Sequence, residues 1–248
     1  MRESVSMKDR IAAEIEQGRK LSRIGAERAW NWASPAGQER WERRVSLLLC
    51  ASKKSPRVLE LGCGTGLLTR ELVGHHPLIV GFDISRDLLQ HAMAKLADSD
   101  VSFVLGDAMN VPFQSESFDA VVGSSILHHV EINVALHEII KILKPGGVFA
   151  FAEPNMLNPQ IAIQKNIPII KRLAGDTPDE TAYFKWAAKK ALLNAGFVKI
   201  GVIPFDFLHP SIPGFLLPLA RPIAMMLERL PLVKEIAGSL LITGRKPG

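Results

Sequence analysis

The chain has 248 residues, 47% of them apolar and 22% charged, which suits one α/β domain with additions. Its two cysteines, Cys50 and Cys63, argue against a disulfide framework or a Cys-x-x-Cys metal site. The net charge is +5, and residues 1–57 hold thirteen Lys and Arg against seven Asp and Glu. Because the acids are interleaved with the bases, this excess favours a solvated helical surface over a site for nucleic acid or an anionic membrane.

The N-terminal residues, MRESVSMKDR, are charged where a signal peptide would be apolar, so we expect a cytoplasmic protein. Residues 8–29 have helical composition, and Trp30, Trp32 and Trp41 follow closely. We expect residues 1–56 to form an N-terminal helical cap. Its tryptophans would either pack the cap onto the core or line a ligand pocket.

Residues Arg57–Gly66, RVLELGCGTG, predict a buried strand that ends in a glycine turn. The glycine pattern is G-x-G-x-G. It differs from the dinucleotide fingerprint G-x-G-x-x-G, which would need glycine at Leu67. Residues 67–73 then favour a helix. A strand, a glycine turn and a helix N-terminus together form a corner that binds nucleotide-type ligands.

Short apolar runs alternate with helical stretches from Arg57 onward. The runs cover residues 58–61, 78–82, 101–105, 118–122 and 148–152, and the helices cover 67–73, 86–97 and 132–143. This alternation predicts a parallel sheet with helices on both faces and a ligand site at the carboxyl ends of the strands. A helix over residues 181–195 that ends at Gly196, and strands over 197–207 and 238–244, complete the expected elements.

Carboxylates follow the second and third predicted strands. Asp83 lies about twenty residues after the first motif glycine, where a carboxylate accepts hydrogen bonds from ribose hydroxyls. Ser85 is better suited than Asp83 to cap the next helix. Asp107 follows the third strand in the sequence Gly-Asp-Ala.

Five segments resemble, in order and spacing over roughly residues 57–155, the class I S-adenosylmethionine (SAM) dependent methyltransferases. The similarity is to the small-molecule branch near the ubiquinone- and menaquinone-type enzymes. The segments are RVLELGCGTG, LIVGFDIS, Gly106-Asp107-Ala108, FDAVVGSSILHHV and LKPGGVFAFAEPN. The resemblance implies an α/β, Rossmann-like, seven-stranded and mostly parallel sheet over residues 57–248, with an antiparallel last strand. It also implies SAM as cofactor and S-adenosylhomocysteine as product.

The resemblance further implies nine cofactor-binding positions at the ends of the first four strands. They are Glu60 near the methionine amine, Gly62, Cys63 and Gly64 as close backbone, Asp83 and Ile84 at the ribose, Asp107 and Ala108 at the adenine, and Ser124 on the methionine side. No metal ion is expected.

Two histidines after the fourth strand, His128 and His129, are candidate catalytic bases. Methyl transfer is a displacement at the sulfonium methyl, so alignment supplies much of the catalysis. A base is needed only when the acceptor loses a proton. We prefer His129 of the two; either could instead cap the helix or contact SAM.

Two segments exceed the minimal fold. Residues 154–180 form a long connection expected to shape the acceptor site. Its polar side chains, Asn155, Asn158, Gln160 and Lys165, would meet an acceptor or satisfy turn backbone. Residues 210–236 form an apolar insertion between the last two strands, interrupted by prolines and so unsuited to span a membrane. We expect this insertion to be a lid, a dimer surface, a peripheral membrane contact or a packed helix.

These observations predict methyl transfer to an O, N or C atom of a small or lipid-like metabolite, in a monomer or homodimer. Residues 123–125, Gly-Ser-Ser, lack the Asn/Asp-Pro-Pro-aromatic motif of base-methylating enzymes, which argues against nucleic acid as the partner. The alternatives are a catalytically silent SAM-binding regulatory protein and, disfavoured by Leu67, an NAD-binding oxidoreductase.

Overall fold

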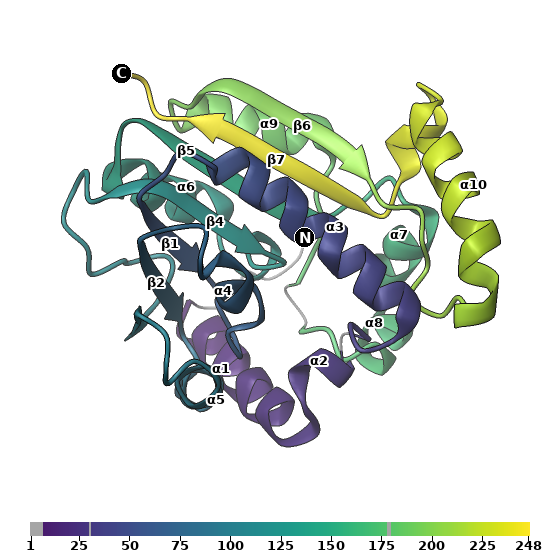
Figure 1. Ribbon diagram of the computed structural model, residues 1–248, viewed down its shortest axis with the longest axis horizontal. Helices are drawn as coiled ribbons and strands as arrows, with labels where there is room; N and C mark the ends of the chain where they lie inside the picture. The colour runs from purple at the N-terminus through teal and green to yellow at the C-terminus, as the bar shows by residue number, and fades with distance from the viewer. Residues whose placement is uncertain (1–6, 30, 178–179) are drawn as a thin grey trace.

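Seven strands form one mixed sheet in the order β3-β2-β1-β4-β5-β7-β6 (Figure 1). The structure, a computed structural model, describes residues 7–29, 31–177 and 180–248. The strands are β1 Arg57–Leu61, β2 Leu78–Asp83, β3 Val101–Leu105, β4 Phe118–Ser124, β5 Leu143–Pro154, β6 Val198–Phe205 and β7 Ser239–Arg245. Strand β7 runs antiparallel to both β5 and β6, and the other pairs are parallel. The predicted seven-stranded sheet with an antiparallel last strand is confirmed.

Helices cover both faces of this sheet (Figure 1). The α-helices of the described residues are α1 Met7–Ile24, α2 Ala26–Ala29, α3 Pro35–Ser52, α4 Leu67–Leu72, α5 Arg86–Lys95, α6 Ile132–Ile142, α7 Pro159–Asn166, α8 Pro168–Leu173, α9 Lys185–Asn194 and α10 Leu217–Arg229. Short 3₁₀ turns are η1 Leu127–His129, η2 Gly214–Leu216 and η3 Val233–Ile236.

The core has two layers of apolar side chains, one on each face of the sheet. On one face, Leu48 of α3 and Leu72 of α4 pack among strand residues such as Val58 and Val122. On the other face, Ile139 of α6 and Leu192 of α9 pack with residues such as Leu59 and Phe149. Alternate strand residues face opposite layers, so the fully buried runs that predicted these strands serve both layers at once.

Strand β5 begins earlier than the predicted residues 148–152. Leu143 already pairs with Phe118, and the register then shifts before Val148 pairs with Ala120. The intervening chain bulges at Gly146, whose φ of +74° suits glycine. The glycine pair therefore lies inside a bulged strand and does not precede it.

The first 56 residues separate into two parts with different neighbours. Helix α1 lies against α5, whereas α3 lies along β4 and β5 within the helical layer (Figure 1). Trp32 packs against Trp41 with ring centroids 5.4 Å apart, and neither lines the cavity described below. Trp30 lies outside the described residues.

The long connection and the apolar insertion fold as short helices. Asn158 caps α7 by accepting from the backbone amides of Gln160 and Ile161. Asn155 donates from Nδ2 to the backbone oxygens of Glu235 and Ala237, so it joins the two segments. These asparagines thus satisfy backbone groups, as one of the two interpretations predicted. No helix of the described chain is long and apolar enough to cross a membrane.

Candidate active site

A narrow cavity lies beyond the carboxyl ends of β1, β2 and β3, where the glycine corner predicts a ligand. Six predicted site residues line it: Gly62, Asp83, Ile84, Asp107, Ala108 and His129. The opposite wall comes from α1, through Arg10, Ile11 and Glu14. Parallel strands bring their carboxyl ends to one edge, which explains why residues distant in the sequence meet here.

The glycine turn brings backbone close to this cavity. Gly62 has a φ of +71°, and a Cβ at this residue would lie 2.6 Å from Cγ1 of Ile126. The amides of Gly62 and Cys63 both donate to the Phe82 carbonyl, at 2.8 and 3.1 Å, and so fasten the turn to β2. A side chain at Gly62 would therefore strain the turn and fill the space that a ligand needs.

Asp83 presents a fixed carboxylate at the end of β2. Its Oδ2 accepts from the Gly64 amide and its Oδ1 from the Ser85 amide, each at 2.8 Å. Burial raises the pKa of this carboxyl, and the two amides oppose the rise. Each carboxylate oxygen can accept more than one hydrogen bond, so Asp83 keeps capacity for a pair of ligand hydroxyls. Ser85 caps α5 as predicted, by accepting from Leu88.

Asp107 and Ala108 form the far wall of the cavity, after β3. The Asp107 Oδ1 accepts from the Met109 amide at 2.9 Å, which holds the turn. Ala108 is buried and lines the cavity beside Met109, where its short side chain leaves room for a ligand.

Four of the predicted cofactor residues do not line the cavity. Glu60 is buried and accepts from the Thr69 hydroxyl at 2.5 Å, so its carboxylate faces α4. Cys63 is also buried, which raises the pKa of its thiol. Gly64 meets Asp83 from the turn, and Ser124 accepts from the Arg44 guanidinium at 3.1 Å. Their contacts with a cofactor remain predictions.

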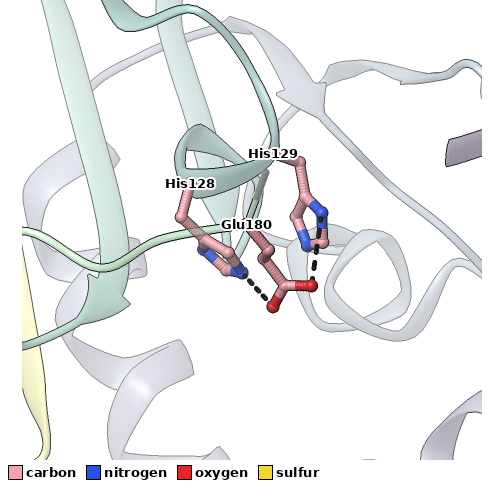
Figure 2. A group of neighbouring side chains, drawn as sticks. All are labelled: His128, His129 and Glu180. Carbon is pink, nitrogen blue, oxygen red and sulfur yellow. Dashed lines mark ion pairs between the residues drawn. The ribbon is translucent and has the colours of Figure 1, made fainter. Parts of the chain in front are cut away.

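His128 is buried in an ion-pair network, and Figure 2 shows its pair with Glu180. Its Nδ1 lies 2.6 Å from Glu153 Oε2 on β5, and its Nε2 lies 3.4 Å from Glu180 Oε1. Burial alone would lower the pKa of His128, but the two carboxylates raise it to about 9. A base must be neutral to accept a proton, so this environment suits a structural role for His128 better than a catalytic one.

His129 faces the cavity from the same 3₁₀ turn, η1. Its Nδ1 lies 3.1 Å from Glu14 Oε2 and 4.0 Å from Glu180 Oε2, at ion-pair distance but without a hydrogen bond (Figure 2). Arg10 donates from Nε to the His129 carbonyl at 2.7 Å, which fixes α1 over the turn. Of the two histidines in η1, His129 is the one whose side chain lines the cavity.

His128, His129 and Glu180 have the residue types of a metal site, and their candidate ligand atoms lie within 4.8 Å of one another. The ammonium of Lys165, however, already contacts Glu180 Oε1 and lies 3.0 Å from Asp176. A cation therefore already balances this carboxylate. The geometry shows an ion-pair network that ties the α7–α8 segment to η1.

Several site residues carried no motif in the sequence. Arg10, Ile11 and Glu14 come from a helix of ordinary amphipathic composition, and Glu180 ends a long connection. Their approach to η1 depends on how distant elements pack, so no local spacing predicts it. A helical stretch before the glycine corner was the one available signal that something covers the site.

Comparisons with known proteins agree with this geometry. A methyltransferase domain family matches residues 59–151. A demethylmenaquinone methyltransferase of Roseiflexus castenholzii is 28% identical over 195 residues, which are 74% of this chain and 76% of the relative. One of Desulfitobacterium hafniense is 26% identical over 232 residues, 85% of this chain and 81% of the relative.

Solved structures share the fold. A SAM-dependent methyltransferase of Thermotoga maritima superposes with a TM-score of 0.66 at 20% identity, over 93% of this chain and 99% of that one. Together with the methyltransferase domain that matches residues 59–151 and the sequence relatives, this fold supports a class I SAM-dependent methyltransferase.

Proposed function

We propose that the enzyme transfers the methyl group of SAM to a lipid-like metabolite whose acceptor atom loses a proton, with His129 as the base. The observation that carries the proposal is the imidazole of His129, which lines the cavity while Nδ1 lies 3.1 Å from the Glu14 carboxylate. A carboxylate beside the ring would stabilise the imidazolium that forms when the histidine accepts a proton.

The residues of the cavity support SAM as the cofactor. Asp83 has acceptor capacity for both ribose hydroxyls, and the short side chain of Ala108 leaves room for the adenine. When bound, SAM supplies a methyl group on a sulfonium, which one nucleophilic displacement removes. We further propose that Glu60 and Ser124 contact the methionine portion after the side chains adjust.

The named relatives support a proposal for the acceptor class. The curated relatives reported above are demethylmenaquinone methyltransferases. We infer a lipid-like acceptor for this chain, with an oxygen or carbon atom that must be deprotonated. Holding such an acceptor in line with the sulfonium would contribute up to roughly 7–11 kcal/mol of barrier lowering. His129 would add the proton transfer.

The first test is ligand binding. SAM and S-adenosylhomocysteine should each raise the melting temperature of the full chain, and NAD should not. Stabilisation by NAD alone would overturn the assignment of the cavity. Asp83→Asn should abolish most of the SAM-induced shift, because an amide replaces one of the acceptor oxygens by a donor.

The second test is turnover with His129→Gln. The variant should lose about 10²–10⁴-fold in kcat, with SAM affinity within about twofold of the wild type, because the imidazole acts in proton transfer. Glu14→Gln should lower kcat less and shift the pH profile. Full turnover in His129→Gln would remove the histidine from the mechanism. SAM binding without turnover on quinol, phenol, amine or glycolipid acceptors would favour a regulatory SAM-binding protein.

A further inference from the structure

Helix α10 presents its apolar side outward. Leu219, Ile223, Met226 and Leu230 have between 43% and 65% of their surface exposed. At 100° per residue these four positions fall within one narrow stripe. The opposite stripe holds Leu217 and Ala224, which are buried. An ordinary surface helix buries its apolar stripe. In α10 the orientation is reversed, because this apolar stripe faces outward.

This orientation is held by specific contacts with α3. Glu228 pairs with Arg43, and Arg221 pairs with Glu39. Both charged residues lie on the inner side of α10, roughly opposite the exposed stripe. The charged side of the helix thus faces protein and the apolar side faces outward.

The apolar surface extends beyond this helix. Of the 25 large apolar residues that the structure exposes, 14 lie in residues 154–180 and 210–236. Helix α8 has no buried residue, and Leu173 at its end is 84% exposed. Asn158, the cap of α7, donates to the backbone oxygen of Ile236 at 2.9 Å, so the two segments lie side by side (Figure 1). We name the exposed side chains of α8, η2, α10 and η3 the apolar flank.

The unpaired charges around the apolar flank are positive. In the part of the chain that the structure describes, no ion pair is found for Arg172, Arg229 or Lys234. Among the described residues of these segments the acids are already paired: Asp176 and Glu180 share Lys165, Glu228 pairs with Arg43, and Glu235 pairs with Lys185. Asp179 lies outside the described residues. An apolar surface with a basic rim is complementary to an anionic lipid bilayer.

The sheet topology places the apolar flank at the edge that carries the cavity. Strands β5 and β6 both run antiparallel to β7, so β6 runs parallel to β5, β4 and β1. The insertion leaves the carboxyl end of β6, at the same edge where Gly62 and His129 meet the cavity. A surface held here would present the active-site edge to whatever it contacts.

We propose that the apolar flank lies on the surface of an anionic membrane and brings the active-site edge to a bilayer-dissolved acceptor. The part concerning the acceptor rests on the lipid-like substrate proposed above. A second copy of the chain is the competing occupant. A symmetric contact through this flank would gather Arg172, Arg229 and Lys234 of both copies at one interface, and like charges at an interface oppose association.

The test is vesicle cosedimentation of the full chain, without SAM or acceptor. The wild type should bind vesicles of phosphatidylcholine with phosphatidylglycerol, and bind phosphatidylcholine alone more weakly. Leu219→Ser/Ile223→Ser should reduce partitioning about tenfold or more, because two half-exposed apolar side chains lose their burial in lipid. Arg229→Gln/Lys234→Gln should reduce it about fivefold per charge at low salt.

The matched control is Met93→Ser/Leu193→Ser. These residues lie on α5 and α9 and are 55% and 56% exposed, so the change in apolar surface is similar but outside the apolar flank. This control should bind vesicles as the wild type does. An equal loss of vesicle binding in Leu219→Ser/Ile223→Ser and in the control Met93→Ser/Leu193→Ser would overturn the proposal. So would the absence of vesicle binding by the wild type. A concentration-dependent dimer that only Leu219→Ser/Ile223→Ser dissolves would instead assign the flank to a second copy.

The test separates this proposal from the proposed function. Vesicle binding requires neither SAM nor a methyl acceptor, whereas the SAM-induced thermal shift requires no membrane. An enzyme that binds SAM and methylates a soluble acceptor but ignores vesicles would refute only the membrane surface. An enzyme that binds vesicles but fails every SAM test would refute only the methyl-transfer assignment.

Discussion

Three carboxylates at the strand ends are all buried, yet their partners differ. Glu60 receives one hydroxyl, Asp83 receives two backbone amides, and Glu153 receives two amides and His128. Burial raises the pKa of Glu60 to about 8 and raises that of Asp83, whereas in Glu153 the His128 contact outweighs burial and lowers the pKa. The number and charge of the donors thus decide whether a buried carboxyl stays ionised.

Glu60 should make the stability of the fold depend on pH. Its pKa is about 8 in the folded chain against 4.5 in the unfolded one, so the folded state binds more protons between these values. The contribution of Glu60 to the free energy of unfolding should therefore be largest below pH 4.5 and should fall as the pH rises from 4.5 to 8. Above pH 8 this contribution is lost. The total fall is on the order of 3–5 kcal/mol.

Glu60→Gln removes this titration and keeps an oxygen for Thr69. Urea unfolding at pH 5.5 and 8.5 measures the effect. The wild type should lose stability between these two values by several kcal/mol more than Glu60→Gln. An equal change in the free energy of unfolding between pH 5.5 and 8.5 in the two proteins would show that Glu60 ionises freely in the folded chain.

At the scale of elements, α1 controls access to the cavity. The free space inside is about 50 Å³, which is room for a few water molecules. Helix α1 forms the outer wall through Arg10, Ile11 and Glu14. We expect α1 or its side chains to move when a cofactor enters, as lids in other enzymes do.

Gly18→Val should disturb this helix selectively. Gly18 is buried where α1 crosses the start of α5, and a Cβ there would overlap the side chain of Ser85. The valine should lift α1 from the cavity and weaken SAM binding by about tenfold, since α1 then covers the ligand less well. Isothermal titration measures the affinity.

Gly25→Ala is the control, because a Cβ there meets only Arg28 Cβ at 3.9 Å, although its φ of +84° costs some helix stability. Unchanged SAM affinity in Gly18→Val, with the far-ultraviolet dichroism of the wild type, would show that α1 does not close on the cofactor.

The elements themselves were largely predictable, but their ends and their neighbours were not. Apolar runs indicated all seven strands, because strands inside the sheet are buried on both faces and the partly exposed edge strands β3 and β6 still pack on the core. The early start of β5 was not predicted from the sequence, because Leu143 has the pattern of a helix end until its pairing with Phe118 is known. Among the residues that line the cavity, Asp83, Asp107 and His129 had been singled out from the sequence and Glu14 had not; Glu180, which contacts both histidines, had been given no role of its own.

At the scale of the whole molecule, Arg44 joins α3 to the carboxyl edge of the sheet. Its guanidinium donates to the hydroxyls of Ser124, Ser125 and Ser239 and to the Ala152 carbonyl. These groups lie after or within β4, β5 and β7, so one buried side chain connects three strands to a helix. Burial lowers the pKa of Arg44 to about 10, which leaves it charged at neutral pH.

Arg44→Met should lower the free energy of unfolding by about 2–3 kcal/mol, because four buried acceptors lose a charged donor. Urea unfolding gives the value. Arg70→Met is the control: Arg70 pairs with Glu71 at the surface, so its loss should cost less than about 1 kcal/mol. Equal stability of both variants would mean that the apolar contacts alone hold α3 on the sheet.

The sequence by itself determined the local chemistry of this enzyme. A strand, a glycine turn and a helix are adjacent in the chain, and so are each strand and the carboxylate that follows it; short-range geometry dictates both. Only the tertiary structure decided what closes the cavity, which carboxylates each histidine meets, and which side of α10 faces outward. Those features depend on contacts between residues far apart in the chain, such as Glu14 with His129 and Glu228 with Arg43. Such contacts arise from the packing of whole elements, which no local spacing encodes.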